Sequence, residues 1–195
     1  MRKLLLAALL STALPAMAVT LSASNLNGNT FTDYSSDGLL ALDINAYNTQ
    51  SLSFNLAFNS AEIAAGSVDF NAVINNFLAG GIAGVRLDFG FAPVVAGSAN
   101  SAFNNTASGV FSVSQVGSSY IVSNLAVPLE HFGVLIGNPY GDGDKFDWQI
   151  NTSALSANTD YAFSVQAVPE PGSLALLCAG LGALGVTARR RKSVK

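Results

Sequence analysis

Three segments of the chain place large apolar side chains at every second position, and this pattern constrains the fold more than any other feature. The segments are residues 51–58, 85–91 and 161–167, where Leu, Phe, Val and Tyr alternate mainly with Ser, Asn, Asp and Ala. Successive side chains of a β-strand point to opposite faces, so each segment predicts a strand with one buried face.

Six further segments have a weaker strand pattern, and turns containing Gly, Asn or Asp separate them. They are residues 19–24, 39–44, 109–116, 120–125, 132–136 and 146–151. Lys and Glu, which usually cover the polar face of surface helices, are scarce between these segments. We therefore predict a mainly β exported domain at residues 19–168, built as an antiparallel β-sandwich of the jelly-roll-like or immunoglobulin-like kind.

One segment of this domain follows a helical period instead. Its apolar residues recur at the spacing i, i+3, i+4, i+7 and i+8, and they are Phe70, Val73, Ile74, Phe77 and Leu78. Asp69 stands at the N-cap position, and Gly80 follows the end. The pattern predicts one short helix, with a strand as the alternative because the Asn residues of its polar face disfavour a helix.

The N-terminus has the three parts of a signal peptide. Met1–Lys3 is basic, residues 4–14 are apolar, and Ala16-Met17-Ala18 follows Pro15 as a small-x-small cleavage site, in which Ala16 and Ala18 are the small residues. We predict a signal peptide at residues 1–18. The Sec translocon and signal peptidase are then partners, and the mature protein begins at Val19.

The C-terminus combines a short motif, an apolar run and a basic cluster. The motif is Pro169, Glu170 and Pro171, and the cluster is Arg189, Arg190, Arg191 and Lys192. The 17 uncharged residues between them, 172–188, span about 25 Å as a helix, close to a bilayer core of about 30 Å. Basic residues favour the cytoplasmic side, so we predict a transmembrane helix at 172–188, a cytoplasmic basic tail at 189–195 and the domain outside.

This order of parts resembles the PEP-CTERM sorting signal of Gram-negative bacteria. The resemblance covers residues 168–195, together with the signal peptide. It implies that an exosortase, an integral-membrane Cys/His transpeptidase, recognises the Pro-Glu-Pro motif and processes the protein near it. It also implies a transient stay in the inner membrane and then a cell-surface or extracellular location. Such systems usually accompany exopolysaccharide production, so an extracellular polysaccharide is an expected partner.

The composition of the domain excludes several classes of function. Residues 19–168 contain eleven acidic and two basic residues, a net charge of −9, against −3 for the whole chain. A domain with this charge has no electrostatic basis for binding nucleic acid. The only cysteine, Cys178, lies in the predicted transmembrane helix, so we expect neither disulfides nor thiol chemistry in the domain.

An acidic loop is the candidate metal site. Asp142, Asp144 and Asp147 follow one another closely among glycines, and carboxylate oxygens are the ligands that Ca²⁺ prefers. The spacing is not that of an EF-hand. The alternative is a solvated turn whose acidic residues Lys145 neutralises, and in that case the domain holds no cofactor.

Catalytic candidates are few. His131 is the only histidine, and neither a Gly-x-Ser-x-Gly nor a His-Glu-x-x-His motif is present. A carboxylate-based glycoside hydrolase needs two acidic residues. It would use two of Glu62, Asp88, Glu130 and the Asp142–Asp147 group.

Aromatic residues raise the possibility of a carbohydrate-binding surface. Tyr120, Tyr140, Phe146 and Trp148 are candidates for a sugar-stacking surface, although alternation with Ile150 predicts that Trp148 is buried. The leading hypothesis is a non-catalytic exported protein of the cell surface or extracellular matrix. The alternatives are a carbohydrate- or calcium-binding β-sandwich module and, behind it, the glycoside hydrolase.

Overall fold

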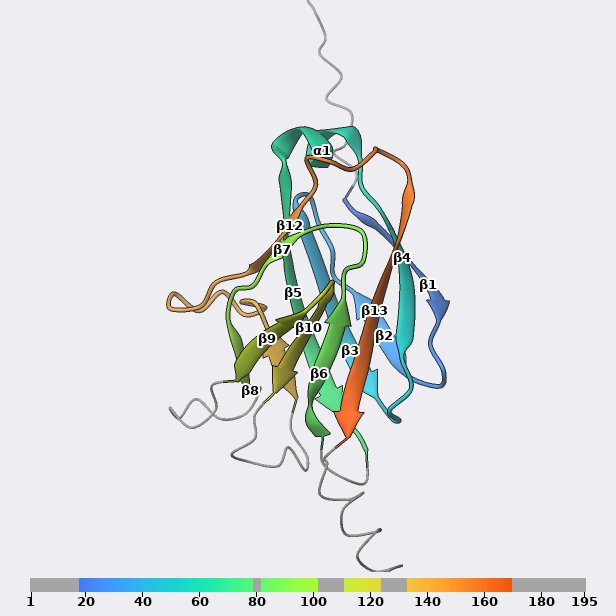
Figure 1. Ribbon diagram of the computed structural model, residues 1–195, viewed down its shortest axis with the longest axis vertical. Helices are drawn as coiled ribbons and strands as arrows, with labels where there is room; N and C mark the ends of the chain where they lie inside the picture. Colours follow the sequence, from blue (N-terminus) through green and yellow to red (C-terminus); the bar gives the residue numbers. More distant parts are fainter. Residues whose placement is uncertain (1–17, 79–81, 102–110, 124–132, 170–195) are drawn as a thin grey trace, which may run out of the picture.

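The computed structural model describes residues 18–78, 82–101, 111–123 and 133–169. Strands dominate these residues, and they contain one short helix (Figure 1). The prediction of a mainly β domain is therefore confirmed. The predicted signal peptide, apart from Ala18, and the predicted transmembrane helix and basic tail lie outside the described residues. Within those residues, no helix is long and apolar enough to cross a membrane.

The first sheet contains six of the described strands, all paired antiparallel. In spatial order they are β1 (Thr20–Asn25), β4 (Leu52–Ala57), β13 (Asp160–Pro169), β6 (Ile82–Asp88), β10 (Ser119–Ser123) and β9 (Ser112–Val116). β13 is a central strand, because β4 pairs with one of its edges and β6 with the other.

The second sheet contains seven of the described strands. β2 (Thr30–Asp33), β3 (Leu39–Ala46), β5 (Ser67–Asn76), β11 (Val134–Ile136) and β8 (Ala99–Ser101) lie in that order. β12 (Trp148–Asn151) pairs with β5 and with β7 (Val94–Val95). β3 and β5 run parallel, so the expectation of purely antiparallel sheets is wrong at this pair. A longer connection through β4 and the helix returns the chain in the same direction, as parallel pairing requires.

Aromatic side chains join the two sheets. Phe163 of β13 lies 5.7 Å from Phe70 of β5, and Tyr120 of β10 lies 5.3 Å from Trp148 of β12, measured between ring centroids. Phe70 and Trp148 are fully buried, which confirms the prediction for Trp148. Each aromatic side chain removes about 150–250 Å² from water, at about 25 cal/mol per Å². These rings therefore contribute much of the stability of a domain without disulfides.

The single described helix, α1 (Ser60–Ala65), was not predicted from sequence. Asn59 caps it by accepting hydrogen bonds from the amides of Ala61 and Glu62, and the Glu62 side chain accepts one from the Asn59 amide in return. This reciprocal arrangement is a capping box. Gly66 ends the helix in the left-handed conformation. The Asn-Ser-Ala-Glu sequence was the available signal for this helix.

The helix predicted around residues 70–78 is wrong, because residues 67–76 form strand β5. Phe70, Ala72 and Ile74 point into the core at period two, while Val73 lies on the other face opposite Leu135 of β11. β5 is an interior strand of its sheet and carries apolar residues on both of its faces, and together these residues produce a false helical spacing. Apolar residues on both faces of a strand, and not a helical conformation, thus account for this spacing.

The nine strands predicted from sequence each overlap an observed strand. The parts of three of them at residues 109–110, 124–125 and 132 lie outside the described residues. Sequence analysis missed β2, β7 and β8, which are two to four residues long. Segments this short show no usable alternation.

Candidate functional site

The C-terminal strand connects the folded domain to the predicted sorting signal. β13 ends at Pro169, which lies opposite Ile82, the first residue of β6. The strand points out of one end of the domain, as the orange arrow of Figure 1 shows. Pro169 is thus both the last paired residue of the sheet and the first residue of the Pro-Glu-Pro motif. Glu170 and Pro171 lie outside the described residues, as does the basic cluster Arg189–Lys192.

The predicted signal-peptide cleavage site lies at the other end of the domain. Ala16 is outside the described residues, whereas Ala18 is half-buried and Val19 is 3 % exposed. β1 starts at Thr20, which pairs with Ala57 of β4 just before α1. The chain therefore enters the domain beside α1.

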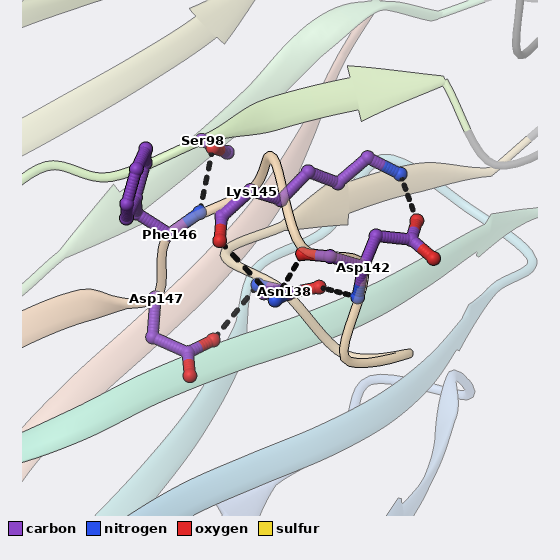
Figure 2. Close-up of polar contacts among 6 residues, drawn as sticks. All are labelled: Ser98, Asn138, Asp142, Lys145, Phe146 and Asp147. Atoms are coloured by element: carbon purple, nitrogen blue, oxygen red, sulfur yellow. Dashed lines mark hydrogen bonds and ion pairs between the residues drawn. The ribbon is translucent and has the colours of Figure 1, made fainter.

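The acidic loop folds around one asparagine (Figure 2). The side chain of Asn138 donates to the backbone oxygens of Asp142 and Lys145 at 2.8 and 3.2 Å, and it accepts from the Asp142 amide at 2.7 Å. Gly137, with φ of +71°, leads into this loop. A Cβ on Gly137 would lie 2.7 Å from the Phe70 carbonyl oxygen. The sequence Gly-Asn-Pro thus builds a self-contained turn.

Two of the three candidate calcium ligands have other partners in this loop. Asp142 forms an ion pair with Lys145 at 2.5 Å, which is the neutralisation that the alternative reading predicts. Oδ1 of Asp147 accepts from the Asn138 amide at 2.8 Å and from the Asn71 side chain at 3.2 Å. Asp144 is exposed. Among the described residues, no group of three or more Asp, Glu, His or Cys side chains is placed to hold a metal ion.

Two of the candidate catalytic acids have structural partners. Asp88 accepts hydrogen bonds from the hydroxyls of Ser118 and Ser119 at 2.9 and 3.1 Å. Glu62 belongs to the capping box of α1. Glu130 and His131 lie outside the described residues.

Glu62 is an acidic residue buried at the α1 end of the domain. Its side chain is 2 % exposed. Burial raises the pKa of Glu62 above its ordinary value of 4.5, and the nearby charge of Asp37 adds to this, whereas the backbone amides of Asn59, Gly38 and Val19 oppose it. Glu62 is one of the acidic residues considered above as a catalytic candidate, but no pattern in the sequence predicts its burial.

The aromatic candidates divide into buried and exposed residues. Trp148 and Tyr120 are buried in the core, and the Tyr120 hydroxyl donates to the Val94 carbonyl at 2.6 Å. Tyr140 and Phe146 are 65 % and 71 % exposed. The four residues therefore do not form one surface.

Tyr140 instead lines a cleft with an aromatic residue that sequence analysis did not single out. The cleft has a volume of about 290 Å³ and lies over the outer face of β3 and β5, with Tyr34 and Tyr140 among its walls. Tyr34 is 65 % exposed. Asp43 and Asn71 also line the cleft. Tyr34 follows β2 and Tyr140 belongs to the acidic loop, so only the tertiary fold brings them together.

The arrangement defines a class: an anionic, mainly β domain whose last strand runs straight into a C-terminal sorting signal. Residues 167–192 match the family model of the PEP-CTERM protein-sorting motif, which confirms the resemblance. This motif marks an exported protein that is anchored in the membrane before an exosortase processes it. No curated protein and no solved structure matches the chain.

Proposed function

We propose that this chain is a non-catalytic exported protein that an exosortase processes at Pro169–Pro171, after which its β domain acts at the cell surface or in the extracellular matrix. The observation that carries the proposal is the sorting motif at residues 167–192, which begins within the last strand of a folded domain. The export machinery therefore delivers the β domain itself, and we infer that its two facing sheets serve as a β-sandwich scaffold.

The sorting signal also sets how the domain is held before processing. Only Glu170 and Pro171 separate the last residue of β13 from the uncharged segment 172–188. Two extended residues span about 7 Å. The end of the domain that carries Pro169 therefore lies close to the surface of the inner membrane that faces away from the cytoplasm. The exosortase then acts on a motif held between a folded sheet and a membrane helix, with the basic cluster in the cytoplasm.

Deletion of the exosortase gene in the producing cell tests this function. We expect the chain without its signal peptide to accumulate at full length in the inner-membrane fraction, and the surface and medium fractions to lose it. An antibody against the β domain reports both fractions. Unchanged amounts of surface protein in the deletion strain would contradict the proposal.

A second candidate function is the binding of a neutral polysaccharide in the cleft between Tyr34 and Tyr140. Both rings are largely exposed and line the same cleft, and exposed aromatic rings stack on the apolar faces of sugar rings. Asp43 and Asn71 supply hydrogen-bonding groups in the cleft, and no Lys or Arg lines it. The net charge of −9 of residues 19–168 repels anionic polymers, so the cleft suits an uncharged one.

Binding of neutral glucans and galactans by the purified chain tests this second function. Tyr34→Ala and Tyr140→Ala each remove one stacking ring and should weaken binding about threefold to tenfold. Phe146→Ala is the matched control, because Phe146 is equally exposed but does not line the cleft. Equal losses in all three variants, or no binding by the parent chain, would assign the cleft no role in polysaccharide binding.

A further inference from the structure

Glu62 carries a buried oxygen atom without a hydrogen-bond partner. Oε2 accepts a hydrogen bond from the Asn59 amide at 2.9 Å. Oε1 is enclosed and has no partner among the described residues, and it is the only buried side-chain polar atom of these residues in that position. An unpaired buried carboxylate oxygen is costly, so such an atom calls for an explanation.

Backbone amides surround this carboxylate without completing its hydrogen bonds. The N–H groups of Gly38 and Val19 face it and favour its charged form, but neither reaches hydrogen-bond geometry at Oε1. Asp37 is the nearby charged group, and it repels the carboxylate. Among the described residues, the groups around Glu62 are backbone dipoles and one like charge, and none of them is a cation.

Val19 is the residue at which the predicted signal peptidase cut creates a new N-terminus. In the chain with residue 18 attached, the Val19 nitrogen is a neutral amide with one hydrogen. After cleavage behind Ala18 the same nitrogen becomes an ammonium group with three hydrogens and a full positive charge. The Val19 side chain belongs to the hydrophobic core and is 3 % exposed, which holds this nitrogen in place beside α1.

We propose that Glu62 is a binding site for the chain's own α-ammonium group, which pairs with the carboxylate once the signal peptide is removed. The ligand class is a primary ammonium, delivered by cleavage rather than from solution. The pair gives Oε1 its missing donor and balances a buried charge. Removal of the signal peptide then completes the packing at the α1 end of the domain.

The inference rests on the proposed export route only through the position of the cut, behind Ala18. It is therefore tested on purified protein, where neither exosortase nor polysaccharide takes part. Two chains are released from a removable fusion partner and held in detergent micelles. One runs from Val19 to Lys195, and the other keeps the single native residue Ala18 in front. Each is made with Glu62 and with Glu62→Gln, which gives four proteins.

Thermal melting at pH 7 distinguishes the outcomes. With Glu62 present, the chain that begins at Val19 should melt about 5 °C higher than the chain that begins at Ala18. In the Glu62→Gln pair this difference should disappear, because Gln keeps the size of the side chain but not its charge. At pH about 3 the difference should also shrink in the Glu62 pair, because the carboxyl is then largely protonated.

Two results would overturn the proposal. One is equal melting temperatures for the two Glu62 chains. The other is an equal shift in the Glu62 and Glu62→Gln pairs, which would assign the effect to the length of the N-terminus. Circular dichroism confirms that all four proteins fold. N-terminal sequencing of the exported protein separately locates the cut in the cell, so failure of the export route would be recognised independently.

Discussion

Pro169 lies opposite Ile82 in the register of the first sheet. The first residue of the Pro-Glu-Pro motif is therefore the last paired residue of a central strand, and the preceding residues of β13 pair with β4 and β6 on its two edges. Processing on the N-terminal side of this residue would shorten the sheet, so we expect the boundary of the mature domain to lie at or after Pro169.

Truncation tests this boundary. A chain that ends at Pro169 should retain a cooperative melting transition and a β-type circular dichroism spectrum. A chain that ends at residue 159 loses β13, which leaves β4 and β6 without their common neighbour, and it should not fold. A folded, cooperatively melting chain without β13 would contradict the central position of this strand.

Phe163 connects the sheets, so its removal should be costly. It is 1 % exposed and packs against Phe70 and Phe89, whose ring centroids lie 5.7 and 4.7 Å away. Phe163→Ala should lower the free energy of unfolding by about 3–5 kcal/mol in urea titrations, because it leaves a cavity. Phe77→Ala is the control, since Phe77 is 56 % exposed, and it should cost far less. Similar losses for both variants would argue against this core.

Glu62 should make the stability depend on pH in the chain that retains Ala18. Burial raises its pKa above the ordinary value of 4.5, so the native state holds the proton to higher pH than the unfolded state does. The corresponding stabilisation is complete below pH 4.5 and is lost as pH rises through the native pKa. Glu62→Gln cannot ionise, so its melting temperature should fall less between pH about 4 and 7. Identical pH profiles for the parent and Glu62→Gln would contradict the burial of an ionisable side chain.

Calcium should not stabilise the domain. Lys145 already pairs with Asp142, and Asp147 already accepts two hydrogen bonds. A calcium site would raise the free energy of unfolding by about 2.7 kcal/mol at a hundredfold excess over the dissociation constant. Melting curves in millimolar calcium and in chelator should therefore coincide. A calcium-dependent rise that Asp144→Ala removes would instead support the calcium hypothesis.

The alternation of apolar and polar residues predicted most strands because these strands bury only one of their two faces. β4 and β13 have one apolar face, so the period of two is visible in the sequence. β5 carries apolar residues on both faces, and Phe70, Val73 and Ile74 then imitate a helix. Phe146 continues the alternation of Trp148 and Ile150 but is exposed, and it lies in the loop before β12 begins, where its amide donates to the Ser98 hydroxyl at 2.9 Å.

The candidate sites differ in how far they could be predicted. The sorting signal is linear, so order and spacing identify it without a fold. The Tyr34–Tyr140 cleft and the unpaired oxygen of Glu62 depend on residues far apart in the sequence. Tyr34 and Tyr140 line one cleft over the outer face of the second sheet, and the Val19 amide faces Glu62 where β1 starts beside α1. The spacing of residues along the sequence does not predict which distant residues come close in the fold.

The most direct test of the account is the fate of Glu170→Ala in the producing cell. We expect this variant to lose its signal peptide and to insert, but to accumulate unprocessed in the inner membrane, as in a strain without the exosortase. Neutral replacement of Arg189, Arg190, Arg191 and Lys192 should have a different effect, namely poor insertion, because the orientation signal is lost. Fractionation with an antibody against the β domain measures both. Release of Glu170→Ala at the normal size and in the normal amount would contradict the account and make the tail an ordinary membrane anchor.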